Sequence, residues 1–191
     1  MPVLPIVTFN DPVLREKTKP VSENSEKLQT LIDDMFETMY NSHGVGLAAP
    51  QVGVELRLFV MDADAVTADL EDEEDLGKIA MINPEILELA GESVRMEEGC
   101  LSIPDVRDEV SRAEQVTVKY LDRNFEQQVL KASGWVSRVI QHEYDHLEGK
   151  LFIDYLSAFR RRLHRSMLKK IESGTLPVEY PVRPKKTVSS G

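Results

Sequence analysis

The sequence has 191 residues, of which 41% are hydrophobic and 29% are charged, and its formal net charge is −10 at pH 7. This length and composition suit one globular domain with its own core. The negative charge argues against general or sequence-specific nucleic-acid binding, and no apolar run is long enough to cross a membrane. The first residues lack the order of a signal peptide, so we expect a cytoplasmic protein.

The first half of the chain predicts one helix and two strands. Residues 24–42 place apolar side chains at helical spacing, and Gly44 closes the expected helix. Residues 55–62 and 78–86 have the composition of strands. The acidic segment between them, residues 66–78, is poorly patterned and predicts a solvated loop.

The second half predicts a hairpin and two helices. Residues 114–122 alternate as a strand does, and residues 125–130 are expected to pair with them. A helix is expected over 134–147 and another over 157–174, the latter with an apolar stripe that includes Phe159 and Leu163. The last residues carry three prolines and predict a loose tail. Strands and helices are segregated, so the fold class is α+β.

The stretch QHEYDHLEG, residues 141–149, has the spacing of a metal site. His142 and His146 lie four residues apart, which puts both imidazoles on one face of a helix. Glu143 stands beside the first histidine, where a carboxylate can act as a general base. A catalytic metal usually has three protein ligands, so a third is required. Two surface histidines with an incidental glutamate are the alternative.

Three possibilities for the third ligand can be weighed. One metalloprotease class has a third histidine where this chain has Phe152, which cannot bind metal. Glu172 lies on the basic helix and is a weak candidate, and His164 is expected to belong to the polar face of that helix. Cys100, the single cysteine, offers a thiolate, which binds zinc or iron strongly. Spacing alone does not bring it to the histidines, and an inert buried cysteine is the alternative.

The stretch GVGLAAPQVG, residues 44–53, matches a dinucleotide fingerprint if it is taken in isolation. That fingerprint must follow a strand and open a helix, whereas this one follows a helix and contains Pro50. We therefore reject a nucleotide site. Glycines here allow the backbone to lie against an extended substrate, and Gln51 offers an amide to developing negative charge. A plain glycine and proline turn is the alternative.

Together, GVGLAAPQVG, EGCLS (98–102) and QHEYDH (141–146) resemble the three motifs of the peptide deformylase family. These metal hydrolases remove the formyl group from the initiating methionine of new bacterial proteins. The resemblance spans roughly residues 3–157. It implies small antiparallel sheets around a central helix that carries HEYDH, with an N-terminal amphipathic helix and a C-terminal basic helix. We expect one catalytic domain over residues 1–174 and a flexible tail over 175–191.

The resemblance implies one divalent metal ion, with Fe²⁺ expected and Zn²⁺, Ni²⁺ or Co²⁺ as substitutes. The implied metal ligands are Cys100, His142 and His146. Glu143 is then the acid and base, while Gln51 and the backbone N–H of Leu101 hold the oxyanion. The expected reaction is attack of a metal-bound hydroxide on the formyl carbonyl, with release of formate.

The resemblance also implies substrate contacts. Gly46 is expected to contact the substrate backbone, and Val45 and Val139 are expected to line a pocket for the methionine side chain. Core packing is the alternative for Val139. Asp145 is a candidate acceptor that orients a ligand histidine; an exposed carboxylate is its alternative.

Formyl-methionyl nascent peptides are the expected partners, which suggests a role for the basic C-terminal helix. Residues 159–191 hold nine basic residues against two acidic ones, in an otherwise acidic chain. The family's C-terminal helix implies docking on the ribosome through Arg160, Arg161, Arg162, Arg165, Lys169 and Lys170. A solvated helix face is the alternative.

Two other functions fit the metal motif less well. A general metallopeptidase should show the extended ligand motif that Phe152 interrupts. A non-catalytic adaptor should close its metal site with a fourth protein ligand, and no further cysteine or histidine is well placed. The presence of both Glu143 and Gln51 favours an enzyme.

Overall fold

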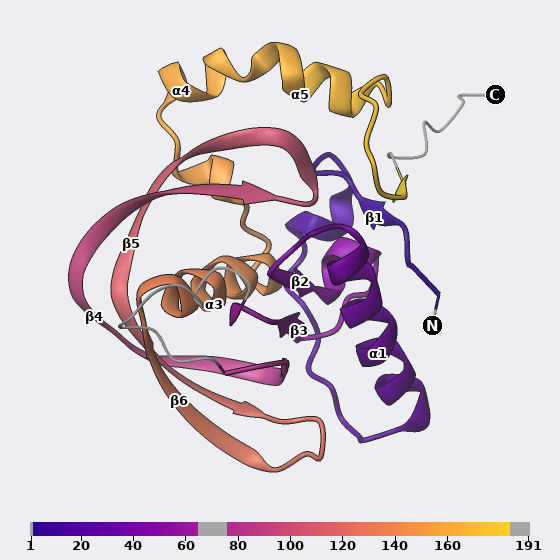
Figure 1. Ribbon diagram of the computed structural model, residues 1–191, viewed down its shortest axis with the longest axis vertical. Coiled ribbons are helices and arrows are strands. Elements are labelled where there is room, and N and C mark those ends of the chain that lie inside the picture. Colours follow the sequence, from indigo (N-terminus) through magenta and orange to yellow (C-terminus); the bar gives the residue numbers. More distant parts are fainter. Residues whose placement is uncertain (1, 65–75, 184–191) are drawn as a thin grey trace.

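The computed structural model describes residues 2–64 and 76–183 (Figure 1). Most of the predicted acidic loop, 66–78, and the last eight residues of the predicted tail therefore lie outside the described residues. No helix within the described ranges is long and apolar enough to span a membrane.

The α+β class is confirmed, because the described residues combine helices with an antiparallel sheet of five strands in the order β2-β3-β4-β5-β6. The strands of this sheet are β2 (Gly46–Ala48), β3 (Leu58–Met61), β4 (Ile79–Cys100), β5 (Ile103–Leu121) and β6 (Gln127–Ser133). The helices are α1 (Glu26–Asn41), α3 (Gly134–Leu147), α4 (Ala158–Leu163) and α5 (Arg165–Glu172). Short 3₁₀ turns occupy Pro12–Arg15, Ala49–Val52 and Phe152–Tyr155.

The predicted hairpin is confirmed, since β5 and β6 pair antiparallel. Strands β4 and β5, however, are much longer than the sequence predicted. Beyond residue 86 strand β4 is largely exposed, the buried row of β5 includes Asp108 and Arg112, and the register shifts at four places along the pair. These features break the apolar alternation that identifies a strand. Figure 1 shows β4, β5 and β6 curving around α3.

Helix α3 is held between the concave sheet and the N-terminal half of the chain. Val136, Val139 and Ile140 pack with strand residues such as Phe59 and Met81 in one buried cluster. A second cluster joins the apolar face of α1 to β2 and β3. The N-terminus of α1 is capped by Ser25, whose hydroxyl accepts a hydrogen bond from the Leu28 amide. The packing of α3 in the first of these clusters fixes its side chains in the interior.

The predicted basic helix is divided at His164 into α4 and α5. The expected apolar stripe is only partly covered, because the side chains of Phe159 and Leu163 are 66% and 60% exposed. The inward side of α4 is polar instead. Arg160 and His164 both bond to the buried carboxylate of Asp108 on β5. Only further along, at Ile171 of α5, is an apolar residue of this helix pair fully buried.

A second, two-stranded sheet joins the two ends of the described chain. Strand β1 (Ile6–Val7) pairs with β7 (Val182–Arg183), and the pairing is parallel, unlike that of the main sheet. The sequence analysis placed a flexible tail from residue 175 onward. The structure gives residues 175–183 a defined path that returns to the N-terminal strand.

Candidate metal and catalytic site

Three side chains with metal-binding atoms meet at the C-terminal end of β4. Cys100 ends this strand, and His142 and His146 project toward it from successive turns of α3. One ligand atom from each residue lies within 4.8 Å of the others, and the Cys100 sulfur is 3.4 Å from His146 Nε2. Cys100 and the HEYDH helix, which are remote in sequence, therefore form one candidate metal site.

The donor set fits a divalent metal. One thiolate and two imidazoles suit zinc or iron and leave a coordination position for water or substrate. Burial, together with the neighbouring His142, lowers the pKa of His146 well below its usual value. A neutral imidazole is the form in which histidine binds a metal.

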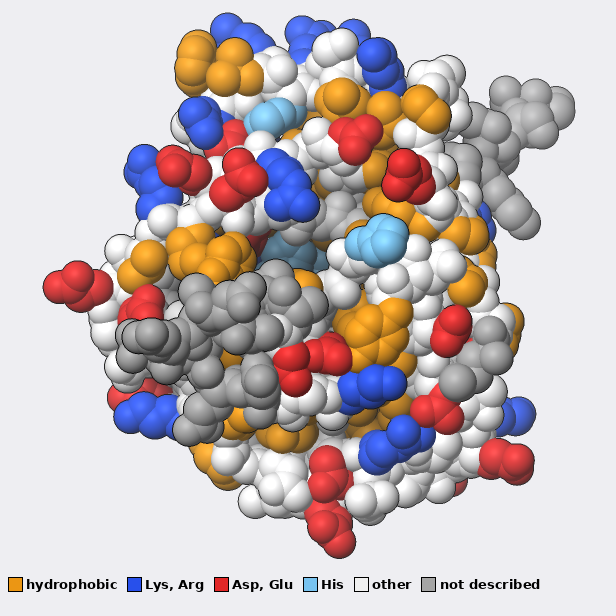
Figure 2. Space-filling view, viewed as in Figure 1, with side chains coloured by type: hydrophobic (Ala, Val, Ile, Leu, Met, Phe, Trp, Pro, Cys, Tyr) orange, Lys and Arg blue, Asp and Glu red, His pale blue; other side chains and the backbone are white. Residues whose placement is uncertain are grey.

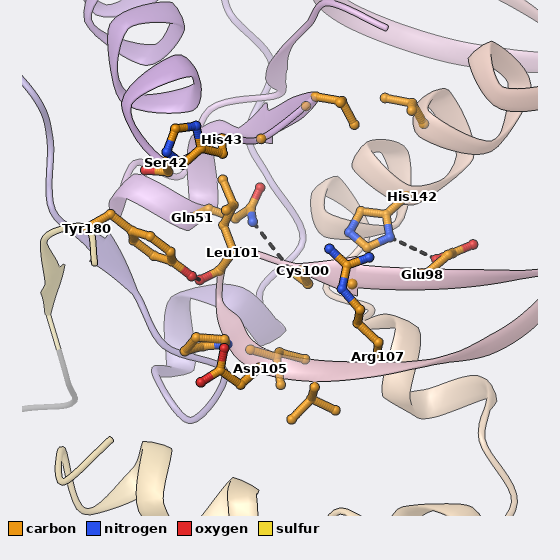
Figure 3. A pocket seen from close by; sticks show the side chains of 18 of the residues that line it. Ser42, His43, Gln51, Glu98, Cys100, Leu101, Asp105, Arg107, His142 and Tyr180 are labelled. Atoms are coloured by element: carbon orange, nitrogen blue, oxygen red, sulfur yellow. Dashed lines mark hydrogen bonds and ion pairs between the residues drawn. The ribbon is translucent and has the colours of Figure 1, made fainter. Parts of the chain in front are cut away.

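The orientation of His142 is fixed by Glu98, a residue to which the sequence analysis assigned no role. A carboxylate only accepts hydrogen bonds, so His142 Nδ1 donates to Glu98 Oε2, at 2.9 Å (Figure 3). His142 Nε2 is then left to face Cys100. The motif EGCLS could have indicated this role for Glu98. Glu98 and Cys100 stand two residues apart on one strand, so their side chains share a face.

Two buried arginines neutralise Glu98. Arg112 Nε and Arg138 Nη1 each donate to Glu98 Oε1 at 2.6 Å. Burial by itself would raise the pKa of the Glu98 carboxyl, but hydrogen bonds from His142 and Arg112 hold it well below its ordinary value. Glu98 is therefore ionised at neutral pH and holds His142 through a charge-assisted bond.

Asp145 does not have the role that we considered for it. It is buried rather than exposed, and it accepts hydrogen bonds from Arg112 Nη1 and the Tyr155 hydroxyl, both at 2.8 Å. Neither candidate ligand histidine donates to it among the described contacts. Glu98 occupies that role instead, and Asp145 contributes by orienting Arg112 from the other side.

Glu143 lies in the interior beside the first glycine-rich motif. A Cβ added at Gly46 would lie 2.5 Å from Glu143 Oε1, so only glycine fits this close approach. Burial raises the pKa of the Glu143 carboxyl to about 7. Its Oε2 has no hydrogen-bond partner among the described residues. The carboxylate therefore retains capacity to accept a proton or a hydrogen bond.

Gln51 is fixed so that its amide nitrogen points at the candidate metal site. Its Oε1 accepts a hydrogen bond from the Ala48 amide at 2.8 Å. Its Nε2 lies 3.5 Å from the Cys100 sulfur and 3.3 Å from the Ser102 hydroxyl (Figure 3). The 3₁₀ turn that contains Pro50 presents this side chain.

Gln51, Glu98, Cys100, His142 and Glu143 line a cleft of about 820 Å³. Figure 2 shows the hollow on this face of the molecule, with histidine side chains at it. The lining includes Gly46, Val45 and Val139, the three residues predicted to contact the substrate, and also Leu101, the predicted oxyanion donor. Val139 also packs in the core, so both interpretations of that residue describe part of its surroundings.

The rejected ligand candidates lie elsewhere or have other contacts. Phe152 stacks against the ring of His142, with centroids 6.2 Å apart. His164 bonds to Asp108, at 2.7 Å. Within the described ranges, the group of residues placed to hold a metal consists of Cys100 and the two histidines of α3.

We predict that Glu98→Gln lowers the free energy of unfolding by about 3–5 kcal/mol, because it leaves the buried Arg138 without a counter-charge and leaves Arg112 with Asp145 alone. The same change should weaken metal affinity about 10- to 100-fold, since it loosens His142. Denaturant unfolding and metal titration measure the two effects. The matched control is Glu97→Gln, an exposed neighbour whose loss should change stability by less than about 0.5 kcal/mol. Equal effects of the two variants would contradict this assignment.

Comparisons with known proteins give the family. A profile of polypeptide deformylases matches residues 3–162. A peptide deformylase from Salinibacter ruber is 51% identical over 183 residues, which cover 94% of each chain, and one from Christiangramia forsetii is 46% identical over 95% of each.

Solved structures agree. The crystal structure of a peptide deformylase from Legionella pneumophila has a TM-score of 0.80 and 44% identity, covering 92% of this chain and all of that one. The Ehrlichia chaffeensis enzyme in complex with actinonin has a TM-score of 0.83 and 40% identity, over 93% of this chain and all of that one. This chain belongs to the peptide deformylase family.

Proposed function

We propose that the cleft binds the formyl-methionyl end of a new peptide, with Cys100, His142 and His146 as metal ligands and Glu143 as acid and base. Family membership makes the chain a metal-dependent hydrolase that removes the N-formyl group from an N-terminal methionine and releases formate. The observation that carries the residue assignment is the meeting of three ligand atoms beside a buried carboxylate in one cleft.

A divalent ion held by these ligands would supply Lewis acidity to the formyl carbonyl and to water. We infer that the resident ion is Fe²⁺. The thiolate and imidazole donors suit iron as well as zinc, and the ionised Glu98 behind His142 adds negative charge beside the site.

Glu143 moves the proton. Its position against Gly46 places its carboxylate at the cleft, within reach of a water molecule that attacks the formyl carbon. The carboxylate accepts the proton of that water and then passes it to the departing α-amine. Burial keeps bulk water from competing for this proton.

Gln51 and Leu101 stabilise the negative charge that develops on the formyl oxygen. Gln51 is already oriented by the Ala48 amide and offers Nε2 beside Cys100. The Leu101 N–H follows directly in the chain and is the second donor. Donors that are fixed before the reaction lower the barrier without reorganising during it.

The substrate backbone has two facing chain segments to lie between. Strand β2, which begins at Gly46, is at the edge of the sheet, and an extended peptide can pair with such an edge. Residues 97–100 of β4 line the same cleft. Val45 and Val139 then supply an apolar contact for the methionine side chain.

We predict that Glu143→Ala lowers kcat for a formyl-Met tripeptide about 100- to 10,000-fold, because proton transfer is lost. The variant should still bind one equivalent of metal, measured by elemental analysis. Glu126→Ala, at the exposed turn before β6, is the control and should match the wild type. A Glu143→Ala enzyme that kept most of its turnover would show that another group moves the proton.

The Fe²⁺ assignment predicts sensitivity to oxygen. Protein purified without oxygen should contain iron and lose activity in air, because a ferrous ion and its cysteine ligand are both readily oxidised. The Ni²⁺-loaded protein should keep its activity under the same exposure. Metal content, free thiol and formate release before and after exposure test this; zinc in the anaerobic protein, or air-stable activity with iron bound, would contradict it.

We further propose that α4 and α5 dock on the ribosome in the cytoplasm, where new chains emerge. Arg160 is engaged by Asp108, so it serves mainly to hold the helix. The exposed cations that remain available for phosphate contacts are Arg161, Arg162, Arg165, Lys169 and Lys170. Exposed Phe159 and Leu163 add apolar surface beside them.

Charge reversal of Arg161, Arg162 and Arg165 to Glu should abolish co-sedimentation with ribosomes, and wild-type binding should weaken as salt rises. Turnover of a short formyl peptide should be unchanged. The control reverses three exposed lysines of other elements, Lys27, Lys131 and Lys150. Ribosome binding that survived in the arginine variant, or that was lost equally in the control, would overturn the docking proposal.

A further inference from the structure

The chain beyond α5 returns to the cleft along a segment that is fixed at both ends. At its start, Leu176 packs with Met167 and Leu168 against a buried cluster. At its end, the carbonyl of Pro181 accepts a hydrogen bond from the Ile6 amide at 2.9 Å, and β7 pairs with β1. Figure 1 shows this path, in yellow, running from α5 to β1.

Between these anchors, Pro177–Tyr180 line the same cleft as Cys100, His142 and Glu143. Pro177 and Pro181 flank the stretch, and each proline fixes its own φ and restricts the residue before it to extended conformations. The segment therefore loses little conformational freedom when a ligand binds beside it. A segment with these properties can act as a preformed wall of the cleft.

Tyr180 contacts Leu101 directly. Its hydroxyl donates a hydrogen bond to the Leu101 carbonyl at 2.8 Å, and Tyr180 and Leu101 both pack at the edge of the same core cluster. Figure 3 shows Tyr180 next to Leu101, on the side of Cys100 away from His142. On the opposite side Leu101 meets Gly44, where an added Cβ would lie 2.7 Å from Leu101 Cδ1. Leu101 is therefore held by contacts with Gly44 of the motif GVGLAAPQVG and with Tyr180 of the segment Pro177–Tyr180.

We propose that Pro177–Tyr180 is a wall of the substrate cleft and that Tyr180 is a positioning residue, which fixes the backbone at Leu101. The hydrogen bond fixes the peptide plane between Leu101 and Ser102. Together with the close contact of the Leu101 side chain at Gly44, it limits the φ and ψ rotations that would turn the Leu101 N–H away. This inference rests on the role proposed above for the Leu101 N–H as an oxyanion donor. Pro177–Tyr180 lies outside the three family motifs, so the proposal gives a catalytic role to a segment that those motifs do not include.

The first test is Tyr180→Phe, which removes one hydroxyl and keeps the ring. Its kcat should fall about 3- to 10-fold at unchanged KM, as expected for one neutral hydrogen bond used at the transition state. Hydrogen exchange of the Leu101 and Ser102 amides should become faster, in metal-free protein as well. Tyr120→Phe, on the β5–β6 hairpin and outside the cleft lining, is the matched control. Unchanged kcat, or exchange equal to that of the control, would overturn the positioning role.

The second test is Tyr180→Ala, which also removes the ring. It should raise KM for a formyl-Met tetrapeptide more than for a formyl-Met dipeptide, because the longer peptide reaches further along the wall. An equal change for both lengths would overturn the wall. If the wild-type protein had no deformylase activity, the proposed function would be refuted. The rate of amide exchange at Leu101 and Ser102 in Tyr180→Phe would still test whether Tyr180 holds Leu101, because that measurement does not depend on activity.

Discussion

A buried carboxylate, Glu98, is the constraint on which the candidate site depends. It accepts hydrogen bonds from a histidine on α3 and from arginines on both α3 and β5, while its own backbone belongs to β4. Removing these charges from water costs several kcal/mol, which only complete pairing offsets. Because Cys100 is two residues further along the same strand, the contacts that fix Glu98 also bring the thiol to the two histidines.

The local parts of the site could be predicted from the sequence. The helix over residues 134–147 and the single face of His142 and His146 follow from spacing alone, and the structure has both. The meeting with Cys100 did not follow from spacing, since it depends on how a long strand curves around α3. It came from the resemblance of three motifs to a family. Glu98 stood inside one of those motifs, and only strand alternation indicated that it shares a face with Cys100.

Non-local pairing accounts for what the sequence did not reveal. The outer halves of β4 and β5 pair through their backbones, but β4 is largely exposed there and the buried row of β5 includes the charged Asp108 and Arg112, so their composition looks like that of loops. Strand β7 pairs with a strand at the opposite end of the chain, and the prolines on either side of it suggested a loose tail. Helix α4 turns a polar face inward because Asp108, from a strand that was not predicted there, binds Arg160 and His164.

The most direct test of the central claim, one metal held by Cys100, His142 and His146, is optical absorption of the Co²⁺-loaded protein. We expect one equivalent of cobalt, a spectrum of low coordination number and a thiolate-to-metal charge-transfer band that Cys100→Ser removes. A spectrum of six-coordinate cobalt without that band, or a band that persists in Cys100→Ser, would contradict the claim.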